Sequence, residues 1–140
     1  MHHFDFQDLL HPSVRLAYHK PLTDLLDAAI KEVYPSQAKS DIRIIDAGAG
    51  TGLVGAALAK LGYTNIDALD ISQEMLNEAA KKKVYTKFIC APLNEQRIPE
   101  IETGAYHALI CIGTLIDSHV KAAALDEMSR MVKPGKRIDL

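Results

Sequence analysis

The chain has 140 residues, a formal net charge of −2 and 48% hydrophobic residues, values that are ordinary for a single globular domain. With no basic excess, the composition gives no electrostatic reason to expect nucleic acid as a partner. No apolar run approaches the ~20 residues of a membrane span, and the N-terminus lacks the basic start and apolar core of a secretory signal. We therefore expect a cytoplasmic protein that acts away from membranes.

The cysteines and histidines give no indication of a metal site or a disulfide. Cys90 and Cys111 lie inside apolar, strand-like runs, which is typical of small buried residues rather than of a disulfide or a metal pair. The six histidines are scattered, and none stands near a cysteine at the spacing of a zinc site. We expect a reduced protein without a bound metal ion.

Residues 1–36 are predicted to form an N-terminal helical segment, separate from a core over residues 37–140. Pro21 fits the first turn of a helix and Pro35 its end. Between them, apolar residues recur at helical spacing and form a stripe about one face wide: Leu22, Leu25, Leu26, Ala29, Ile30 and Val33.

The stretch from Ile44 to Gly52 predicts a strand, a tight glycine turn and the start of a helix. Two β-branched residues lead into Asp46, and glycines follow at alternate positions 48, 50 and 52. Glycine accepts positive φ and lets a ligand approach the backbone, and the N–H groups at a helix start face such a ligand. The dinucleotide pattern G-x-G-x-x-G would need glycine where Leu53 stands. A plain strand-to-helix turn remains the alternative.

A second acid follows the next predicted strand. Residues 65–70 read as a strand that ends in Asp70, and a helix starts at Ser72. The distance from Gly48 is close to the ~20 residues expected for a carboxylate that binds a ribose in a βαβ unit. A carboxylate accepts two hydroxyl protons at once, which suits a ribose diol. The alternative is that Asp70 caps the following helix, although Ser72 is equally suited to that role.

The rest of the chain continues the alternation of strands and helices. Strands are predicted over residues 86–90 and 106–113, the latter apolar enough to be covered on both faces of a parallel sheet. A helix is predicted over residues 120–132, with Leu125, Met128 and Val132 on one face. Lysines 81–83 are expected to form a solvated helix end. The fold class is therefore α/β, a Rossmann-like doubly wound parallel sheet.

Three stretches resemble the successive motifs of class I S-adenosylmethionine-dependent methyltransferases: residues 46–52, residues 69–76 and residues 125–135. The resemblance covers most of the chain from about Ile42 onward. Within that superfamily the chain is most similar to the Williams–Beuren-region methyltransferase-like group, through residues 18–21, 51–54 and 109–115.

The resemblance implies S-adenosyl-L-methionine as the cofactor and gives each site residue a role. The glycine turn would surround the methionine portion, and Asp46 would order that turn and attract the ammonium group. Asp70 would bind the ribose, while Ile71 and Met75 would flank the adenine, although plain helix-to-sheet packing remains open for Met75. The residues that the resemblance assigns to cofactor binding are Asp46, Gly48, Ala49, Gly50, Gly52, Asp70, Ile71, Met75, Ala91, Pro92, Ile112 and Gly113.

Two of these assignments are limited to part of the residue. Residues after the third strand depart from the family's common Gly-Asp-Leu pattern, so Ala91 and Pro92 are assigned backbone contacts only. Ile112 and Gly113, at the end of the fourth strand, would border the methionine half of the cofactor, where strands one and four meet.

The resemblance also implies a sheet larger than this chain supplies. The family sheet has seven strands in the order 3-2-1-4-5-7-6, and the chain covers strands one to four and the start of strand five. Lys136 stands where the family usually has a second glycine. We interpret the chain as C-terminally truncated and expect strand four to have a poorly covered edge. It should then be less stable than a complete homologue.

The implied reaction is methyl transfer by in-line attack of an unidentified acceptor on the sulfonium methyl, with no catalytic residue assigned. Tyr18 is a candidate lid residue or an aromatic at a helix end, and His119 is a candidate base or a surface histidine. One alternative is a nicotinamide-dependent oxidoreductase, which Leu53 and the turn at residues 133–135 disfavour. Another is a non-catalytic cofactor-binding or regulatory module. The sequence indicates neither the acceptor nor an oligomeric state.

Overall fold

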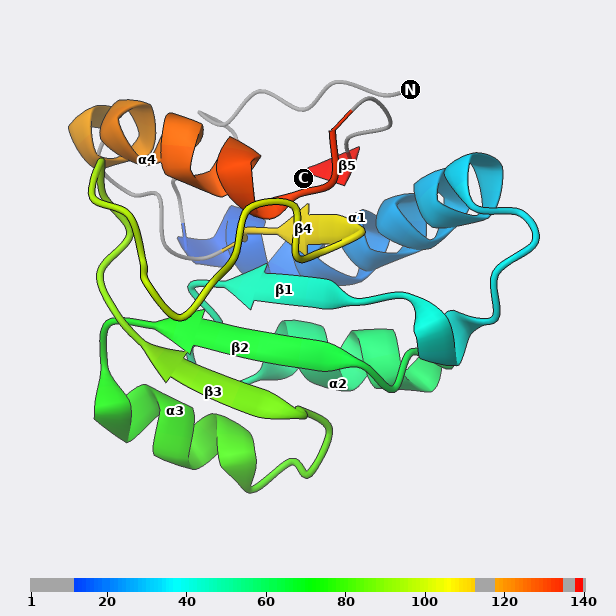
Figure 1. Ribbon diagram of the computed structural model, residues 1–140. Coiled ribbons are helices and arrows are strands. Elements are labelled where there is room, and N and C mark those ends of the chain that lie inside the picture. Colours follow the sequence, from blue (N-terminus) through cyan, green and yellow to red (C-terminus); the bar gives the residue numbers. More distant parts are fainter. Residues whose placement is uncertain (1–11, 113–117, 135–137, 140) are drawn as a thin grey trace.

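The computed structural model describes residues 12–112, 118–134 and 138–139 (Figure 1). Its helices and strands alternate along the chain, and its strands form a single parallel sheet in the order β3-β2-β1-β4-β5. None of the helices in the described ranges has the length and apolar character needed to cross a membrane. The elements are α1 (Pro12–Val33), the short 3-10 helix η2 (Lys39–Asp41), β1 (Ile44–Ala47), α2 (Leu53–Lys60), β2 (Ile66–Asp70), α3 (Gln73–Ala80), β3 (Lys87–Cys90), β4 (Ala108–Ile110), α4 (Ser118–Met131) and β5 (Ile138–Asp139).

The strand order confirms the predicted doubly wound sheet. The chain moves from β1 through β2 to β3 on one side, then returns to place β4 on the other side of β1. Asp46 in β1 is level with Ala68 in β2 and with Ile110 in β4. The strand order therefore reverses between β1 and β4, and ligands of open α/β sheets bind outside the carboxyl ends of the strands at such a point.

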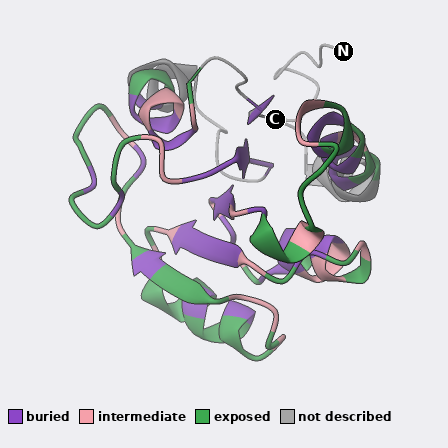
Figure 2. Cartoon of the chain, turned by 45° about the vertical axis from the view of Figure 1, so that its right-hand side comes forward, coloured by how far each residue is buried: buried purple, intermediate pink, exposed green. Residues whose placement is uncertain are grey.

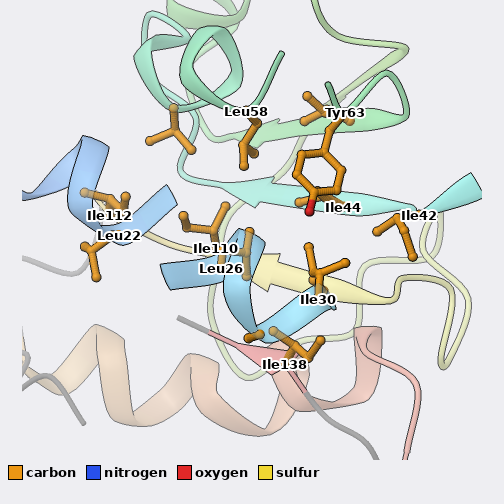
Figure 3. Close-up of a cluster of buried hydrophobic side chains, with 14 residues drawn as sticks. Leu22, Leu26, Ile30, Ile42, Ile44, Leu58, Tyr63, Ile110, Ile112 and Ile138 are labelled. Carbon is orange, nitrogen blue, oxygen red and sulfur yellow. The ribbon is translucent and has the colours of Figure 1, made fainter. Parts of the chain in front are cut away.

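Both faces of the sheet are covered by helices, so the central strands are buried on both sides (Figure 2). Alternate residues of a strand point to opposite faces. Ile44 packs with residues of α1 and α2 in one cluster (Figure 3), whereas Ile45 packs with residues of α4 in another. A smaller cluster places Leu76 of α3 against Ala68. This burial explains why β4 reads as a continuous apolar run.

Helix α1 begins earlier than the sequence indicates. Pro21 lies inside the helix and Pro12 is its first residue, whereas the prediction placed Pro21 in the first turn. A proline inside a helix removes one backbone hydrogen bond, so Pro21 was a reasonable start position in a segment whose upstream residues lack a clear period. The side chains of Leu22, Leu26 and Ile30 confirm the predicted apolar face, since all three are buried in the core (Figure 3).

Three further predictions are wrong. Leu125 of α4 is 44% exposed; the buried face runs instead through Ala124, Met128 and Met131. Cys90 is exposed, because it occupies the solvent-facing position of an edge strand; Cys111 is buried as predicted. The edge of β4 is covered rather than open, since Ala108 pairs with Ile138 and Leu109 with Asp139 of β5.

Candidate functional site

The glycine turn between β1 and α2 has the backbone conformation that glycine was predicted to supply. The φ angles of Gly48, Gly50 and Gly52 are 72°, 57° and 93°, a left-handed region that other residues seldom adopt. The turn is held by backbone bonds to β2, because the amides of Gly48 and Ala49 both donate to the carbonyl of Leu69, at 2.7 and 3.0 Å. The turn is therefore a fixed feature of the sheet edge.

The space over the turn is open at Gly50 and closed at Gly52. A Cβ at Gly50 would meet no atom within 4 Å, whereas a Cβ at Gly52 would lie 3.2 Å from Ala79 and from Lys82. Gly52 thus allows α3 to pack against the turn, and Gly50 leaves bare backbone facing free space. A ligand can approach the backbone at Gly50 more closely than any side chain there would permit.

Asp70, the last residue of β2, connects the glycine turn to the next turn. Its Oδ2 accepts a hydrogen bond from the amide of Gly50 at 2.9 Å, and its Oδ1 accepts one from the amide of Ser72 at 2.9 Å. The cap of α3 is Ser72, whose Oγ accepts from the amide of Met75 at 3.2 Å. Asp70 is not the cap, and each of its partly exposed oxygens keeps a lone pair for a further donor.

Asp46 lies behind the turn and is 1% exposed. Its Oδ2 accepts a hydrogen bond of 2.6 Å from the hydroxyl of Tyr85. The pKa of Asp46 is raised to about 7, mainly by burial and to a lesser extent by the negative charge of Asp70, while the Tyr85 hydrogen bond opposes both effects. Asp46 makes no ion pair with any described residue. Two neighbouring carboxylates with no cation between them favour a positively charged ligand.

Ile71 and Met75 are large apolar side chains left in solvent beside this turn. Ile71 is 68% exposed and Met75 is 44% exposed. Met75 is therefore not buried between α3 and the sheet, which was the alternative to a ligand contact. Buried apolar residues of α3 exist, but they are Leu76 and Ala79. The edge of the site thus offers an apolar surface next to the carboxylate of Asp70.

Sequence reasoning missed three residues around the turn. Lys82 contacts Thr51 in the turn, and Tyr85 contacts Asp46 before the turn and Gly55 after it, in each case across at least 30 residues of sequence. Lys82 was expected to be solvated with its neighbours, but its Nζ donates to the carbonyl of Thr51 at 2.5 Å. The sequence could have pointed to Gly55, because an isolated glycine in a helical pattern often marks a close packing contact. Nothing in the local pattern around Tyr85 indicated its partner.

The comparison with known proteins agrees with this geometry. Residues 44–135, from β1 to the turn after α4, match the family described as the methyltransferase domain. The chain belongs to the methyltransferase domain family. The predicted superfamily is thereby confirmed, and the glycine turn, Asp70 and the exposed apolar edge all lie inside the matched residues of this methyltransferase domain.

Individual relatives support the same assignment. The chain is 33% identical over 92 residues to human methyltransferase-like protein 27, an alignment that covers 66% of this chain and 37% of the relative. It is 32% identical over 100 residues to the ubiquinone biosynthesis O-methyltransferase of Colwellia psychrerythraea, covering 68% and 39%. These alignments thus cover less than half of each relative's length.

A solved structure matches the fold of this methyltransferase domain. It is a SAM-bound amino pentose methyltransferase from Micromonospora echinaspora, with a TM-score of 0.62 and 19% identity over 96% of this chain and 56% of that one. At this identity the likeness concerns the fold alone.

The remaining residues predicted for the methyltransferase site offer fewer groups for contact with a cofactor than expected. The amide of Ala91 already donates to the carbonyl of Asp70 at 3.0 Å, and Pro92 has no amide, so a backbone contact from either would come from a carbonyl. Ile112 is 7% exposed and packs in the core near α1. Gly113 lies outside the described residues, as do the side chains of Tyr18 and His119.

Two other features of the methyltransferase domain do not add to this site. A groove of about 220 Å³ between α1 and α2 is mostly apolar and contains none of the predicted cofactor residues. Its lining residues are Thr23, Asp24, Leu53, Ala56, Ala57, Lys60 and Leu61. Across the described ranges, no cluster of histidine, cysteine and acidic side chains could hold a metal ion.

Proposed function

We propose that this chain binds S-adenosyl-L-methionine at the glycine turn and acts in a methyltransferase that passes the cofactor's methyl group to an acceptor. The observation that carries the proposal is the open backbone at Gly50 beside two carboxylates, Asp46 and Asp70, which have no cationic partner among the described residues. This arrangement lies where the strand order reverses, and the matched family is that of a methyltransferase domain.

The residues present fit such a cofactor. Gly50 leaves room for the methionine portion to lie against the backbone. The lone pairs that remain on Asp70 suit the two hydroxyls of a ribose, and Ile71 with Met75 offers an apolar surface for the adenine. The negative charge of Asp46 complements the ammonium and sulfonium groups, although its burial means that it acts across the turn rather than by open contact.

The bound cofactor would supply the chemical reactivity through its sulfonium-linked methyl group. The protein's part is alignment, because an in-line attack depends on holding two groups in the correct geometry. The matched relatives are named for different acceptors, so the acceptor is left unassigned and no base is proposed. Cys90 is an exposed free thiol, which supports a reducing compartment, and we propose the cytoplasm.

Calorimetry with S-adenosylhomocysteine tests the proposal. The chain should bind this product, and Asp70→Ala should weaken binding by about 1–3 kcal/mol because a charged hydrogen-bond acceptor is lost. Asp126→Ala removes an exposed carboxylate on α4 and should leave the affinity unchanged. Titration with NADH tests the oxidoreductase alternative. A folded chain that binds NADH and ignores S-adenosylhomocysteine would overturn the proposal.

Binding alone does not separate an enzyme from a cofactor-binding module. Turnover of radiolabelled S-adenosylmethionine with a panel of hydroxyl, amine and carboxylate acceptors makes that distinction. Methyl transfer to any of them, abolished in Asp70→Ala, supports the enzyme. Tight binding without methyl transfer to any acceptor of the panel would favour the regulatory module.

A further inference from the structure

Tyr85 lies between α3 and β3, and its hydroxyl joins two separate parts of the site. The hydroxyl donates to Oδ2 of Asp46 at 2.6 Å, and its oxygen accepts from the amide of Gly55 at 3.2 Å. We propose that Tyr85 is a positioning residue of the cofactor site, which holds the Asp46 carboxylate in its ionised form behind the glycine turn and so sets the affinity for a positively charged cofactor. This inference rests on the proposed function.

The contact with α2 depends on the absence of a side chain at Gly55. A Cβ at Gly55 would lie 2.3 Å from Cζ and 2.4 Å from the hydroxyl oxygen of Tyr85, far closer than a Cβ approaches a non-bonded atom. Gly55 is inside a helix, where glycine costs about 1 kcal/mol relative to alanine. The sequence thus carries a helix-weakening residue at the one place where it lets the Tyr85 ring reach Asp46.

Tyr85 also replaces a missing helix cap. The N-cap of α2 is Gly52, which has no side chain to accept a hydrogen bond. A capping side chain normally accepts from the second or third amide of the helix, and Gly55 is the third residue of α2. The hydroxyl oxygen of Tyr85 takes that role from 30 residues away. The glycine turn can therefore stay free of side chains while the helix start keeps its cap.

The surroundings of Asp46 make its charge depend on Tyr85. Its neighbours across the sheet, Ala68 and Ile110, are apolar, and the charge of Asp70 opposes a second negative charge nearby. From the turn after α3, the Lys82 ammonium reaches the glycine turn but donates to the Thr51 carbonyl. The Tyr85 hydroxyl is the only hydrogen-bond donor to the Asp46 carboxylate among the described residues.

Removing the Tyr85 hydroxyl should raise the pKa of Asp46. With the Tyr85 hydrogen bond in place the pKa of Asp46 is about 7, raised mainly by burial, and that hydrogen bond is the effect that lowers it. A hydrogen bond to a charged group is worth enough to shift a pKa by about one unit. In Tyr85→Phe, Asp46 should therefore be largely protonated at pH 7, and its attraction for a cation should be lost there but restored at higher pH.

The experiment is calorimetric binding of S-adenosylhomocysteine, whose amino group is positively charged, from pH 5.5 to 9. Wild-type affinity should rise as Asp46 ionises. For Tyr85→Phe the midpoint should move up by about one pH unit, with affinity about fivefold weaker at pH 7 and within about twofold of wild type at pH 9. Gly55→Ala, which displaces the ring, should behave in the same way.

Tyr63→Phe is the matched control, because it removes another tyrosine hydroxyl that donates to a buried carboxylate, and it should leave the pH profile unchanged. Curves for Tyr85→Phe that run parallel to wild type at every pH would overturn the inference. If both site variants fail to fold, the pH dependence of the wild-type affinity is the test. A wild-type affinity that does not vary between pH 5.5 and 8.5 would also overturn the inference. A wild type that binds at no pH would instead refute the proposed function.

Discussion

Tyrosine hydroxyls donate to buried carboxylates in three places within the described residues, and the three pairs differ in the charge around them. Two pairs lie beside cations, and the third lies beside another carboxylate. The first two are Tyr63 with Asp27 at 2.5 Å and Tyr106 with Asp67 at 2.6 Å, and the third is Tyr85 with Asp46 at 2.6 Å.

The cations neutralise the first two carboxylates within the protein. Asp27 lies 2.9 Å from Lys31 and 3.5 Å from Lys39, and Asp67 lies 3.7 Å from Arg43. Among the described residues, the charge that acts on Asp46 is that of another carboxylate, Asp70. Among the described residues, the fold pairs its other buried acids with cations but leaves Asp46 without one, which supports the proposal that its negative charge serves a ligand. The difference separates residues that stabilise the fold from residues that serve the site.

The largest effect is expected from Asp67→Asn, which breaks one of the neutralised pairs. The change leaves Arg43 without its carboxylate and weakens the acceptor of the Tyr106 hydroxyl. We expect a loss of about 3 kcal/mol in the free energy of unfolding, measured by urea denaturation at pH 7. Affinity for S-adenosylhomocysteine should stay within about twofold of wild type. A loss of affinity without a loss of stability would contradict the division between fold and site.

Asp46→Asn should raise the free energy of unfolding at high pH, whereas Asp67→Asn lowers it. The pKa of Asp46 in the folded chain is about 7, above the ordinary 3.8, so wild-type stability falls as pH rises between these values. Asparagine carries no charge to bury, and the variant should be about 2 kcal/mol more stable than wild type at pH 8, since an unpartnered amide offsets part of the ~4 kcal/mol cost.

At pH 4 residue 46 is neutral in both folded forms, so only the cost of the unpartnered amide remains and the variant should be about 2 kcal/mol less stable than wild type. Urea denaturation at pH 4 and pH 8 measures the difference. The gain at pH 8 should be accompanied by weaker S-adenosylhomocysteine binding, as expected when a strained charge serves function. Lower stability of Asp46→Asn at pH 8 would show that Asp46 is another structural acid.

How far the sequence could predict this site depends on how local each contact is. The glycine turn was predictable because φ angles are set within a few residues, and alternate glycines after a β-branched strand permit few other conformations. Asp70 was predictable from its spacing, since a βαβ unit fixes the distance between successive strand ends. The sheet order followed from the alternation of elements and from the family resemblance.

Contacts between distant segments were not predictable in this way. Tyr85 reaches Asp46 across 39 residues, and its position depends on how α3 and β3 dock rather than on any local period. The same holds for the exposed Cys90 and Leu125, whose types suggest burial although tertiary packing places them in solvent. Hydrophobic pattern identifies an element, but only the assembled fold decides which of its faces is covered.

A smaller effect is expected from Tyr63→Phe. Burial raises the pKa of Asp27, but the Tyr63 hydrogen bond and the two lysines outweigh it, so the pKa lies below 3.8. Asp27 therefore adds stability above about pH 4 that is lost as pH falls through its folded pKa. The variant should lose about 1 kcal/mol at pH 7 and less at pH 3. Acid and neutral urea denaturation give both values, and a loss that grows toward acid would contradict the assignment.

The smallest effect is expected at the apolar edge of the site. Met75→Gln replaces a side chain that is 44% exposed, so stability should change by less than about 0.5 kcal/mol. If adenine packs there, part of the side chain's apolar area is buried on binding, and affinity for S-adenosylhomocysteine should fall about threefold. Leu125→Gln on α4, also 44% exposed, is the matched control and should bind like wild type. Equal affinities for the two variants would remove Met75 from the site and leave the glycine turn with the carboxylates of Asp46 and Asp70.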